Sequence, residues 1–263
     1  MLKTNYNQSQ PSYPVLALAI HNGHDLSTEL SSICGISEAD RLREEDPYTG
    51  EIAQRFTNNI IVHSSRFMVD LNRSPEKAVY QNPEDCWGLP VRKNPIPEEY
   101  LAYLKASYDA WYEVLRQIIT DFLARHPLLV VFDIHSYNHR RGGPDAIPDP
   151  QSQNPDIIIG RSNMPAAFHP LVSKLTSLLN GARVNRTEID CREDVKFSGG
   201  HLSRWLHSNF PGRVLCLAIE FKKIFMNEWT GELNSSKLAN MSVLFKNAVD
   251  AWLIGEMGIF PGD

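Results

Sequence analysis

The segment with the clearest chemical potential places an acid and an imidazole at the end of an apolar run. Residues 128–132 are apolar, and Asp133, Ile134 and His135 follow them directly. Side chains alternate along a strand, so Asp133 and His135 share one face while Ile134 takes the other. Open α/β sheets build active sites in this way, at the carboxyl ends of buried strands. We therefore expect His135 to lie in an active site.

The same arrangement recurs near the start of the chain. Residues 15–20 are apolar and run into His21, with His24 and Asp25 close behind. A catalytic zinc site uses three protein ligands and leaves one position for water. Metal-bound water loses its proton near neutral pH, and the metal polarises a carbonyl. We predict that His21, His24 and His135 hold a metal ion, with Asp25 as the alternative to His24.

Two acids complete this arrangement. Asp133 lies two residues before His135, and an acid in that position can orient a histidine ligand, which we prefer to direct metal binding. Glu220 follows a strongly apolar strand, where a carboxylate is costly unless it is paired, bound to metal or catalytic. We predict that Glu220 is a general base, taking a proton from the water and giving it to the leaving nitrogen. The alternative is an ion pair with Lys222 or Lys223.

A second group of polar residues lies in residues 69–74, which read Val-Asp-Leu-Asn-Arg-Ser. On a strand, Asp70 and Asn72 would share a face, and Arg73 would follow at the strand end. Arginine presents a planar fork that matches a carboxylate in a bidentate manner, and Asn72 can donate beside it. This pattern predicts a pocket for an acidic substrate. The alternative for Arg73 is an ion pair at the surface.

Two adjacent glycines precede a short helix that we predict over residues 200–207. Gly199 and Gly200 would let backbone amides approach an anion at the helix N-terminus, with Arg204 one turn further on. A pair of glycines is by itself more often just a turn. Residues 140–143, Arg-Arg-Gly-Gly, form a similar basic loop, for which the alternative is a solvated loop.

Strands and helices alternate along the chain. Strands are expected at residues 15–20, 59–62, 128–134, 157–159 and 215–219, and helices at residues 97–124, 165–179, 200–207 and 234–254. In the longest helix Leu104, Tyr108, Trp111 and Leu115 recur at helical spacing. This alternation, without a break in composition, predicts one α/β domain over residues 1–263 with a loose polar lead-in at residues 1–13.

The composition excludes several classes of partner. The chain has 263 residues, 42% of them hydrophobic and 22% charged, and a net charge of −5. These values are ordinary for a globular protein and give no electrostatic reason to expect nucleic acid or a membrane surface. No apolar run suggests a membrane span, and the polar start does not indicate export. The four cysteines form no CxxC pair, so we expect reduced thiols in the cytoplasm.

Four motifs together resemble the N-formylglutamate amidohydrolase family. They are Val-Asp-Leu-Asn-Arg-Ser (69–74), Asp-Ile-His-Ser-Tyr (133–137), Gly-Gly-His-Leu-Ser-Arg (199–204) and Ala-Ile-Glu-Phe-Lys-Lys-Ile-Phe-Met-Asn-Glu (218–228). They occur in that family's order and span most of the chain. The family is related to zinc carboxypeptidases. The resemblance therefore implies one zinc ion per chain and a three-layer α/β/α fold with a mixed central sheet, of the zinc-carboxypeptidase-like or phosphorylase/hydrolase-like kind.

The resemblance also implies roles for single residues. His21 and His135 match the two zinc histidines, and Asn72 and Arg73 match the pair that holds the substrate carboxylate. Arg73 is thereby expected to contribute to catalysis as well as binding, and Glu220 matches the catalytic base.

Tyr137, in the His-Ser-Tyr turn, joins the expected substrate-binding residues. The chain departs from the related sites in two places. The glutamate of the carboxypeptidase HxxE motif is His24 here, and the family's opening Pro-His-Ser-Gly reads Ile-His-Asn-Gly-His at residues 20–24.

We therefore predict a metal-dependent amidohydrolase, preferably zinc-dependent, that acts on a small acidic N-acyl amino acid such as N-formylglutamate. The nearest rival is a carboxypeptidase or poly-γ-glutamate hydrolase with the same site. The rival from another class is a binding protein for a carboxylate ligand that lacks turnover. Glu220 and His135 argue against that reading, because a mere binder gains little from a buried acid.

Overall fold

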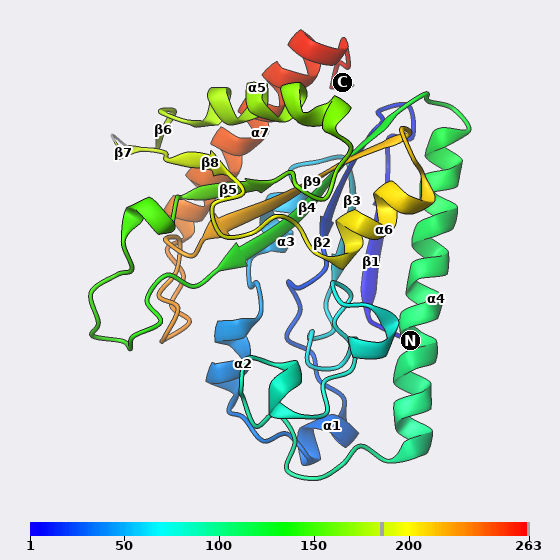
Figure 1. Ribbon diagram of the computed structural model, residues 1–263, viewed down its shortest axis with the longest axis vertical. Coiled ribbons are helices and arrows are strands. Elements are labelled where there is room, and N and C mark those ends of the chain that lie inside the picture. Colours follow the sequence, from blue (N-terminus) through cyan, green and yellow to red (C-terminus); the bar gives the residue numbers. More distant parts are fainter. Residues whose placement is uncertain (185–186, 262–263) are drawn as a thin grey trace.

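The protein is described by a computed structural model over residues 1–184 and 187–261. Its centre is a mixed seven-stranded sheet with helices on both faces (Figure 1). In sheet order the strands are β1 (Thr4–Gln8), β3 (Asn58–Val62), β2 (Val15–Ala19), β4 (Leu129–Tyr137), β9 (Val214–Lys222), β5 (Ile157–Gly160) and β8 (Cys191–Glu193). The strands β6 (Arg183–Val184) and β7 (Thr187–Glu188) form a separate pair. The predicted α/β class with a mixed sheet is confirmed.

The direction of the strands determines where the loops meet. The neighbours β3, β2, β4 and β9 all run parallel, whereas β1 is antiparallel to β3 and β5 is antiparallel to β9. The carboxyl ends of four adjacent strands therefore lie along one edge of the sheet. Loops that follow those strands can build a common site there.

Helices cover the sheet in two layers (Figure 1). One face carries α4 (Glu98–Leu123) and α6 (His201–Asn209), and the other carries α3 (Thr49–Ala53), α5 (His169–Leu179) and α7 (Ser235–Met257). The short helices α1 (Thr28–Ser32) and α2 (Glu38–Glu44) lie apart from both faces. Four single 3₁₀ turns complete the described helices, namely η1 (Pro75–Lys77), η2 (Pro83–Asp85), η3 (Gln151–Gln153) and η4 (Ala166–Phe168). The helices in the described part of the chain thus complete the three-layer arrangement.

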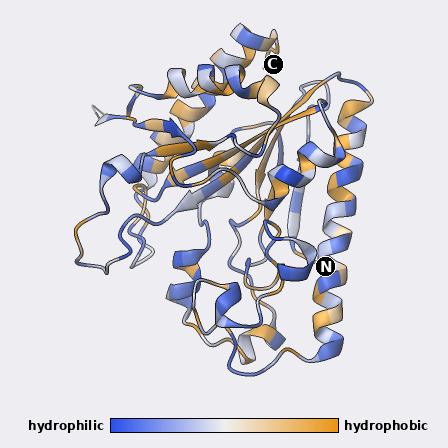
Figure 2. Cartoon of the chain, viewed as in Figure 1, coloured by the Kyte–Doolittle hydropathy of each residue, from blue (hydrophilic) through white to orange (hydrophobic). Residues whose placement is uncertain are grey.

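Both faces of the central strands are buried, and this explains their apolar sequences. Along β2, Val15 and Ala17 pack into one apolar cluster with α5 and α7, while Leu16 and Leu18 pack into a second cluster with α4. All five residues of β2 are fully buried. The hydrophobic colouring of Figure 2 accordingly concentrates in the middle of the sheet.

The predicted helix at residues 97–124 is confirmed as α4. Pro97 precedes it, and Glu98 and Glu99 occupy the first turn, where the helix dipole favours negative charge. Its buried residues follow the predicted periodicity and include Trp111 and Leu115. Ser27 is the N-cap of α1, where its hydroxyl accepts a hydrogen bond from the backbone N–H of Leu30.

Two expectations were wrong. Residues 1–13 are not a loose lead-in, because Thr4–Gln8 forms the edge strand β1. The side chains of β1 are polar and mostly exposed, so the strand is held by its backbone pairing with β3. Asp70 and Asn72 do not share a strand face either, because residues 67–73 form turns and irregular backbone with no strand. The Asp70 carboxylate accepts the backbone N–H of Asn72 at 2.8 Å, which bends the chain locally.

The strand ends that carry the chemistry agree with the prediction, although β4 and β9 extend further than expected. Consequently His135 and Glu220 lie within strands and not beyond them. In the described part of the chain, no helix is long and apolar enough to cross a membrane.

Candidate metal and active site

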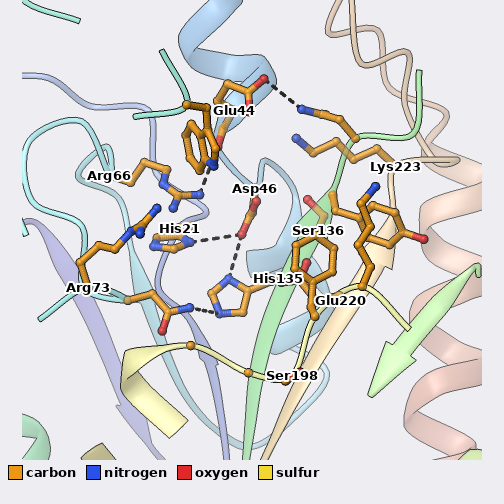
Figure 3. Close-up of a pocket in the computed structure, with 18 of the residues that line it drawn as sticks. His21, Glu44, Asp46, Arg66, Arg73, His135, Ser136, Ser198, Glu220 and Lys223 are labelled. Atoms are coloured by element: carbon orange, nitrogen blue, oxygen red, sulfur yellow. Dashed lines mark hydrogen bonds and ion pairs between the residues drawn. The ribbon is translucent and has the colours of Figure 1, made fainter. Parts of the chain in front are cut away.

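A cavity of about 660 Å³ opens at the carboxyl ends of the central parallel strands (Figure 3). His21 follows β2, while His135 and Glu220 lie near the ends of β4 and β9. The parallel register of β4 and β9 sets His135 directly opposite Glu220. All three side chains line the cavity, so the structure brings together three residues that the sequence analysis selected.

His21, His135 and Asp46 form a compact cluster at this cavity. Their potential ligand atoms all lie within 4.8 Å of one another, and all three side chains are buried. Asp46 Oδ2 lies 2.9 Å from His135 Nδ1 and 3.4 Å from His21 Nδ1. The dashed lines in Figure 3 show Asp46 between the two imidazoles. Burial alone would raise the pKa of Asp46, but its hydrogen bonds to His135 and His21 outweigh burial and lower it.

Each imidazole is held from its other side by a carboxylate. His21 Nε2 lies 2.7 Å from Asp70 Oδ1, and His135 Nε2 lies 2.9 Å from Asp133 Oδ1. The His21–Asp70 contact is a hydrogen bond, and such bonds orient the histidine ligands of metal sites and fix their tautomers. Asp133 lies close to His135 Nε2, but neither of its oxygens has a hydrogen-bond partner within the described residues. Burial alone would lower the pKa of His135, but Asp133 and Asp46 outweigh burial and raise it.

The donor set suits a metal ion. His21 Nδ1 is buried and has no hydrogen-bond partner within the described residues, although it lies 3.4 Å from Asp46 Oδ2. Two imidazole nitrogens and one carboxylate are the ligands of several hydrolytic zinc enzymes. A cation between these three groups would satisfy the His21 nitrogen and neutralise the Asp46 carboxylate.

A buried network supports Asp70. Arg66 Nη2 donates to Asp70 Oδ2 at 2.7 Å, and the Tyr80 hydroxyl donates to the same oxygen. Burial alone would raise the pKa of Asp70, but Arg66 and His21 outweigh burial and hold it well below its usual range. Asp70 therefore remains an anion that can orient His21.

Among the carboxyl groups of the cavity, Glu220 has a raised pKa. Burial raises the pKa of Glu220 to about 8, reinforced by the negative charges of Asp46 and Asp133 and opposed by His135. A carboxyl group whose pKa is shifted toward neutrality can both accept and release a proton near pH 7.

The structure does not bring His24 or Asp25 to the cluster. His24 is hydrogen-bonded through Nδ1 to Glu45, and Arg41 Nη2 lies 3.1 Å from its Nε2. Asp25 is exposed and pairs with Lys3 at 2.6 Å. The backbone after His21 continues alongside Ser64 and Ser65 through two β-bridges, so it does not turn back toward His21. Asp46 lies in the position that we had expected one of these two residues to fill.

Asn72 joins the cluster to α6. Its side-chain Nδ2 lies 3.3 Å from His135 Nε2, and its Oδ1 accepts the backbone N–H of Leu202 at 3.0 Å. Gly200 is required here, because a Cβ at this position would lie 2.0 Å from Asn72 Oδ1. Arg73, which is half-buried, and Arg204, which is exposed, both line the cavity. The Arg73 Nε atom lies 3.7 Å from Asp70 Oδ2.

Gly199 and Tyr137 also line the cavity. Gly199 has a φ of +97°, and a Cβ there would lie 2.7 Å from Ser203 Oγ. Its carbonyl accepts a hydrogen bond from Asn163 at 2.7 Å. The Tyr137 hydroxyl donates to the carbonyl of Pro155, so its ring, not its hydroxyl, faces the cavity.

Sequence reasoning missed several cavity residues. Asp46 stands in the run Glu-Glu-Asp-Pro-Tyr-Thr-Gly, which indicates only a charged turn. Lys223 is buried and donates to two backbone carbonyls, whereas the sequence suggested only a partner for Glu220. The other cavity residues that we did not predict include Glu44, Arg66, Lys77, Trp87, Ser136, Asn138, Lys196 and Phe197. The only sequence signal for any of these residues is the high density of charged residues before Pro47, which includes Glu44 and Asp46.

Comparisons with known proteins agree with the motifs. A family model described as N-formylglutamate amidohydrolase matches residues 13–226. A crystal structure of N-formylglutamate amidohydrolase from Ralstonia eutropha JMP134 is similar, with a TM-score of 0.73 at 13% identity, covering 97% of this chain and 100% of that one. A crystal structure of a gene product from Agrobacterium tumefaciens has a TM-score of 0.65 at 16% identity, covering 94% and 95% of the respective chains. No curated protein matches the chain. At these identities the structural likeness concerns the fold.

Proposed function

The chain belongs to the N-formylglutamate amidohydrolase family, and we propose that it is a metal-dependent hydrolase of small acidic N-acyl amino acids such as N-formylglutamate. One observation carries the proposal. Two histidines, each with a carboxylate within 3 Å of its Nε2 atom, face Asp46 at a cavity that Glu220 also lines. A site that serves only to bind a carboxylate would not need this group of buried acids.

His21 Nδ1, His135 Nδ1 and one Asp46 oxygen would hold the metal ion, and zinc is the preferred ion because this donor set suits it. When bound, the ion lowers the pKa of its water and polarises the substrate carbonyl. Asp70 and Asp133 keep the two imidazoles in the required orientation.

Glu220 acts as the proton carrier in this proposal. It takes a proton from the attacking water as the oxygen bonds to the acyl carbon. It then delivers that proton to the amide nitrogen as the carbon–nitrogen bond breaks. Its place opposite His135, together with its raised pKa, supports this role.

Asn72 and Arg73 bind the carboxylates of the amino acid, with Arg204 and the N-terminal end of α6 assisting. Asp70 lies behind Arg73 and limits the positions that the guanidinium can take. Arg73 also contributes to catalysis, because it fixes the substrate in the reactive geometry. A cytoplasmic setting is part of the proposal, supported by the four cysteines, which all lie in the described chain as free thiols.

The test is turnover with and without metal. We expect the purified protein to release formate and glutamate from N-formyl-L-glutamate. Treatment with a chelator should abolish the activity, and added zinc should restore it. A metal-loaded protein that binds N-acyl amino acids but hydrolyses none of them would contradict the proposal.

A further inference from the structure

We propose that the cavity contains a second anion-binding subsite, on the side of Lys223, and that the preferred acyl group therefore carries its own carboxylate. This inference rests on the proposed function and narrows its substrate class. It places the two carboxylates of the glutamate on the side of Asn72, Arg73 and Arg204, and the anionic end of the acyl group on the opposite side of the cluster.

The charge of the cavity is the first argument. The chain carries a net charge of −5, yet the cavity has more basic than acidic side chains. The basic residues that line it are Arg66, Arg73, Lys77, Arg141, Lys196, Arg204 and Lys223, against the acids Glu44, Asp46 and Glu220. Clefts lined by one sign of charge attract ligands of the opposite sign. The two carboxylates of an N-acylglutamate would occupy part of this set, which leaves cations on the Lys223 side for a further anion.

The topology separates the polar residues of the cavity into two groups on either side of the cluster. Asn72 and Arg73 lie in the loop after β3, whereas Lys223 directly follows β9. In the sheet, β2 and β4 lie between β3 and β9, and they supply His21 and His135. Figure 3 likewise shows Arg73 and Lys223 on opposite sides of Asp46. A substrate held at both ends would therefore cross the cluster, with its amide bond in the middle.

Lys223 is a buried cation that lines the cavity. Its residue is 1% exposed, and its Nζ donates to the carbonyls of Arg43 at 2.6 Å and Glu45 at 2.7 Å. It forms no ion pair among residues 1–184 and 187–261. An ammonium group is costly to bury without a counter-ion, and a third N–H is left for a ligand.

Two further polar atoms on this side lack partners. Ser136 Oγ and Asn138 Oδ1 come from the end of β4 and the residue after it, and both residues line the cavity. Ser136 is 6% and Asn138 3% exposed, and neither atom has a hydrogen-bond partner in the described chain. Buried polar atoms normally find partners. The Ser136 hydroxyl can donate to a carboxylate, whereas the Asn138 amide oxygen only accepts and would contact such a ligand through a water molecule.

Lys196 and Arg141 complete the second group. Lys196 Nζ donates to Asn154 Oδ1 at 2.8 Å and lies 5.1 Å from the centre of the Tyr137 ring, so the lysine is held at the cavity. Arg141 lies 3.6 Å from a Glu44 oxygen. Glu44 is itself paired with Arg43 at 2.7 Å, which offsets its charge toward an incoming anion.

The size of the cavity supports the same conclusion. Its volume of about 660 Å³ falls within the range of ~300–1,000 Å³ that encloses drug-sized ligands. A formyl group is a single carbon and its oxygen, so it leaves the Lys223 side unfilled. A dicarboxylic acyl group, such as succinyl or glutaryl, would extend its free carboxylate into that side. Hydrolysis then adds water across the amide and yields the amino acid and the dicarboxylate.

The experiment compares matched substrates with the metal-loaded protein. N-glutaryl-L-glutamate is paired with its terminal carboxamide, which has the same shape without the charge, and N-formyl-L-glutamate is the reference. We expect kcat/KM for the carboxylate to exceed that for the carboxamide by at least ~10-fold, because hydrogen bonds to charged groups are the stronger ones. Equal values for the pair would overturn the inference.

Variants locate the effect. Lys196→Met and Arg141→Gln should each bring the carboxylate-to-carboxamide ratio toward one. Arg73→Gln should lower both rates and leave the ratio unchanged. Lys105→Met, at an exposed position of α4, is the matched control for the loss of a lysine. A ratio that survives in both Lys196→Met and Arg141→Gln would contradict the assigned subsite.

Calorimetry separates the two proposals. We expect glutarate to bind the wild-type protein more tightly than its monoamide, and Lys196→Met to remove this difference. If N-formyl-L-glutamate is hydrolysed but the charged acyl group gives no advantage, the inference fails and the proposed function stands. If no substrate is hydrolysed, the proposed function fails, and the glutarate titration alone decides whether the subsite exists.

Discussion

Replacing Glu220 by glutamine should lower activity and stabilise the metal-free fold at the same time. The side chain keeps its shape but can no longer ionise. As a general base Glu220 should contribute ~10²–10⁴-fold to turnover. Because Glu220 is buried, ionising its carboxyl group, as a general base must be ionised, destabilises the folded protein. A residue that contributes to function at the expense of stability is expected at an active site.

The magnitude follows from the pKa of Glu220, which burial raises from 4.5 to about 8. The unfolded chain loses this proton near pH 4.5, whereas the folded chain keeps it until about pH 8. Stability therefore falls as the pH rises between these two values and is constant above them. At pH 7 the difference corresponds to about 3 kcal/mol of the free energy of unfolding, at ~1.36 kcal/mol per pKa unit. Glutamine removes this penalty.

The assay is denaturant unfolding of chelator-treated wild type and Glu220→Gln between pH 4 and 8, with turnover of the zinc-loaded proteins measured in parallel. We expect equal stability near pH 4 and a growing advantage for the variant toward pH 8. A variant that is less stable than wild type at pH 7, or that keeps full activity, would refute the reasoning.

Three further predictions concern the surroundings of the site. Asp70→Asn should weaken zinc binding by ~10- to 100-fold, measured by competition with a chelator, because the contact that orients His21 is weakened. Glu228→Gln should lower the free energy of unfolding at neutral pH. In wild type the same contribution to stability is lost as the pH falls from 4.5 to about 2. Burial alone would raise the pKa of Glu228, but hydrogen bonds from His139 outweigh it and lower the pKa to about 2. Trp87→Ala should raise KM by ~3- to 10-fold with little change in kcat, because the centre of its ring lies 5.0 Å from the guanidinium carbon of Arg66 and 6.0 Å from that of Arg73, within the range of cation–π attraction.

Each of these predictions has a control. Asp25→Asn removes an exposed acid that lies outside the cluster and should leave zinc affinity unchanged. Acid unfolding curves of Glu228→Gln that parallel those of wild type would rule out the assigned role of Glu228. Trp87→Phe should retain part of the cation–π attraction, so a KM equal to that of Trp87→Ala would argue against this role of the ring.

The fold was predictable where local pattern and burial coincide. The strands β2, β4 and β9 are buried on both faces, so their apolar sequences identify them. The helix α4 has one apolar face, so its periodicity identifies it. The strand β1 has no such pattern, because its exposed side chains are polar and only its backbone pairs with β3.

The site was predictable where its residues lie at the ends of such strands. His21, His135 and Glu220 meet because β2, β4 and β9 are parallel neighbours. Asp46 reaches the same point from a loop after α2, where only tertiary packing decides which way a side chain faces. His24 is near His21 in sequence, yet its backbone follows Ser65 and carries it away from the cluster.

The most direct test of the account is the metal content of three purified proteins, measured by elemental mass spectrometry after incubation with zinc and removal of the excess. The account predicts about one zinc ion per chain in wild type and in His24→Ala, and none in Asp46→Ala. Zinc retained by Asp46→Ala and lost from His24→Ala would contradict the assigned site. The absence of metal from all three would contradict a metal-dependent mechanism altogether.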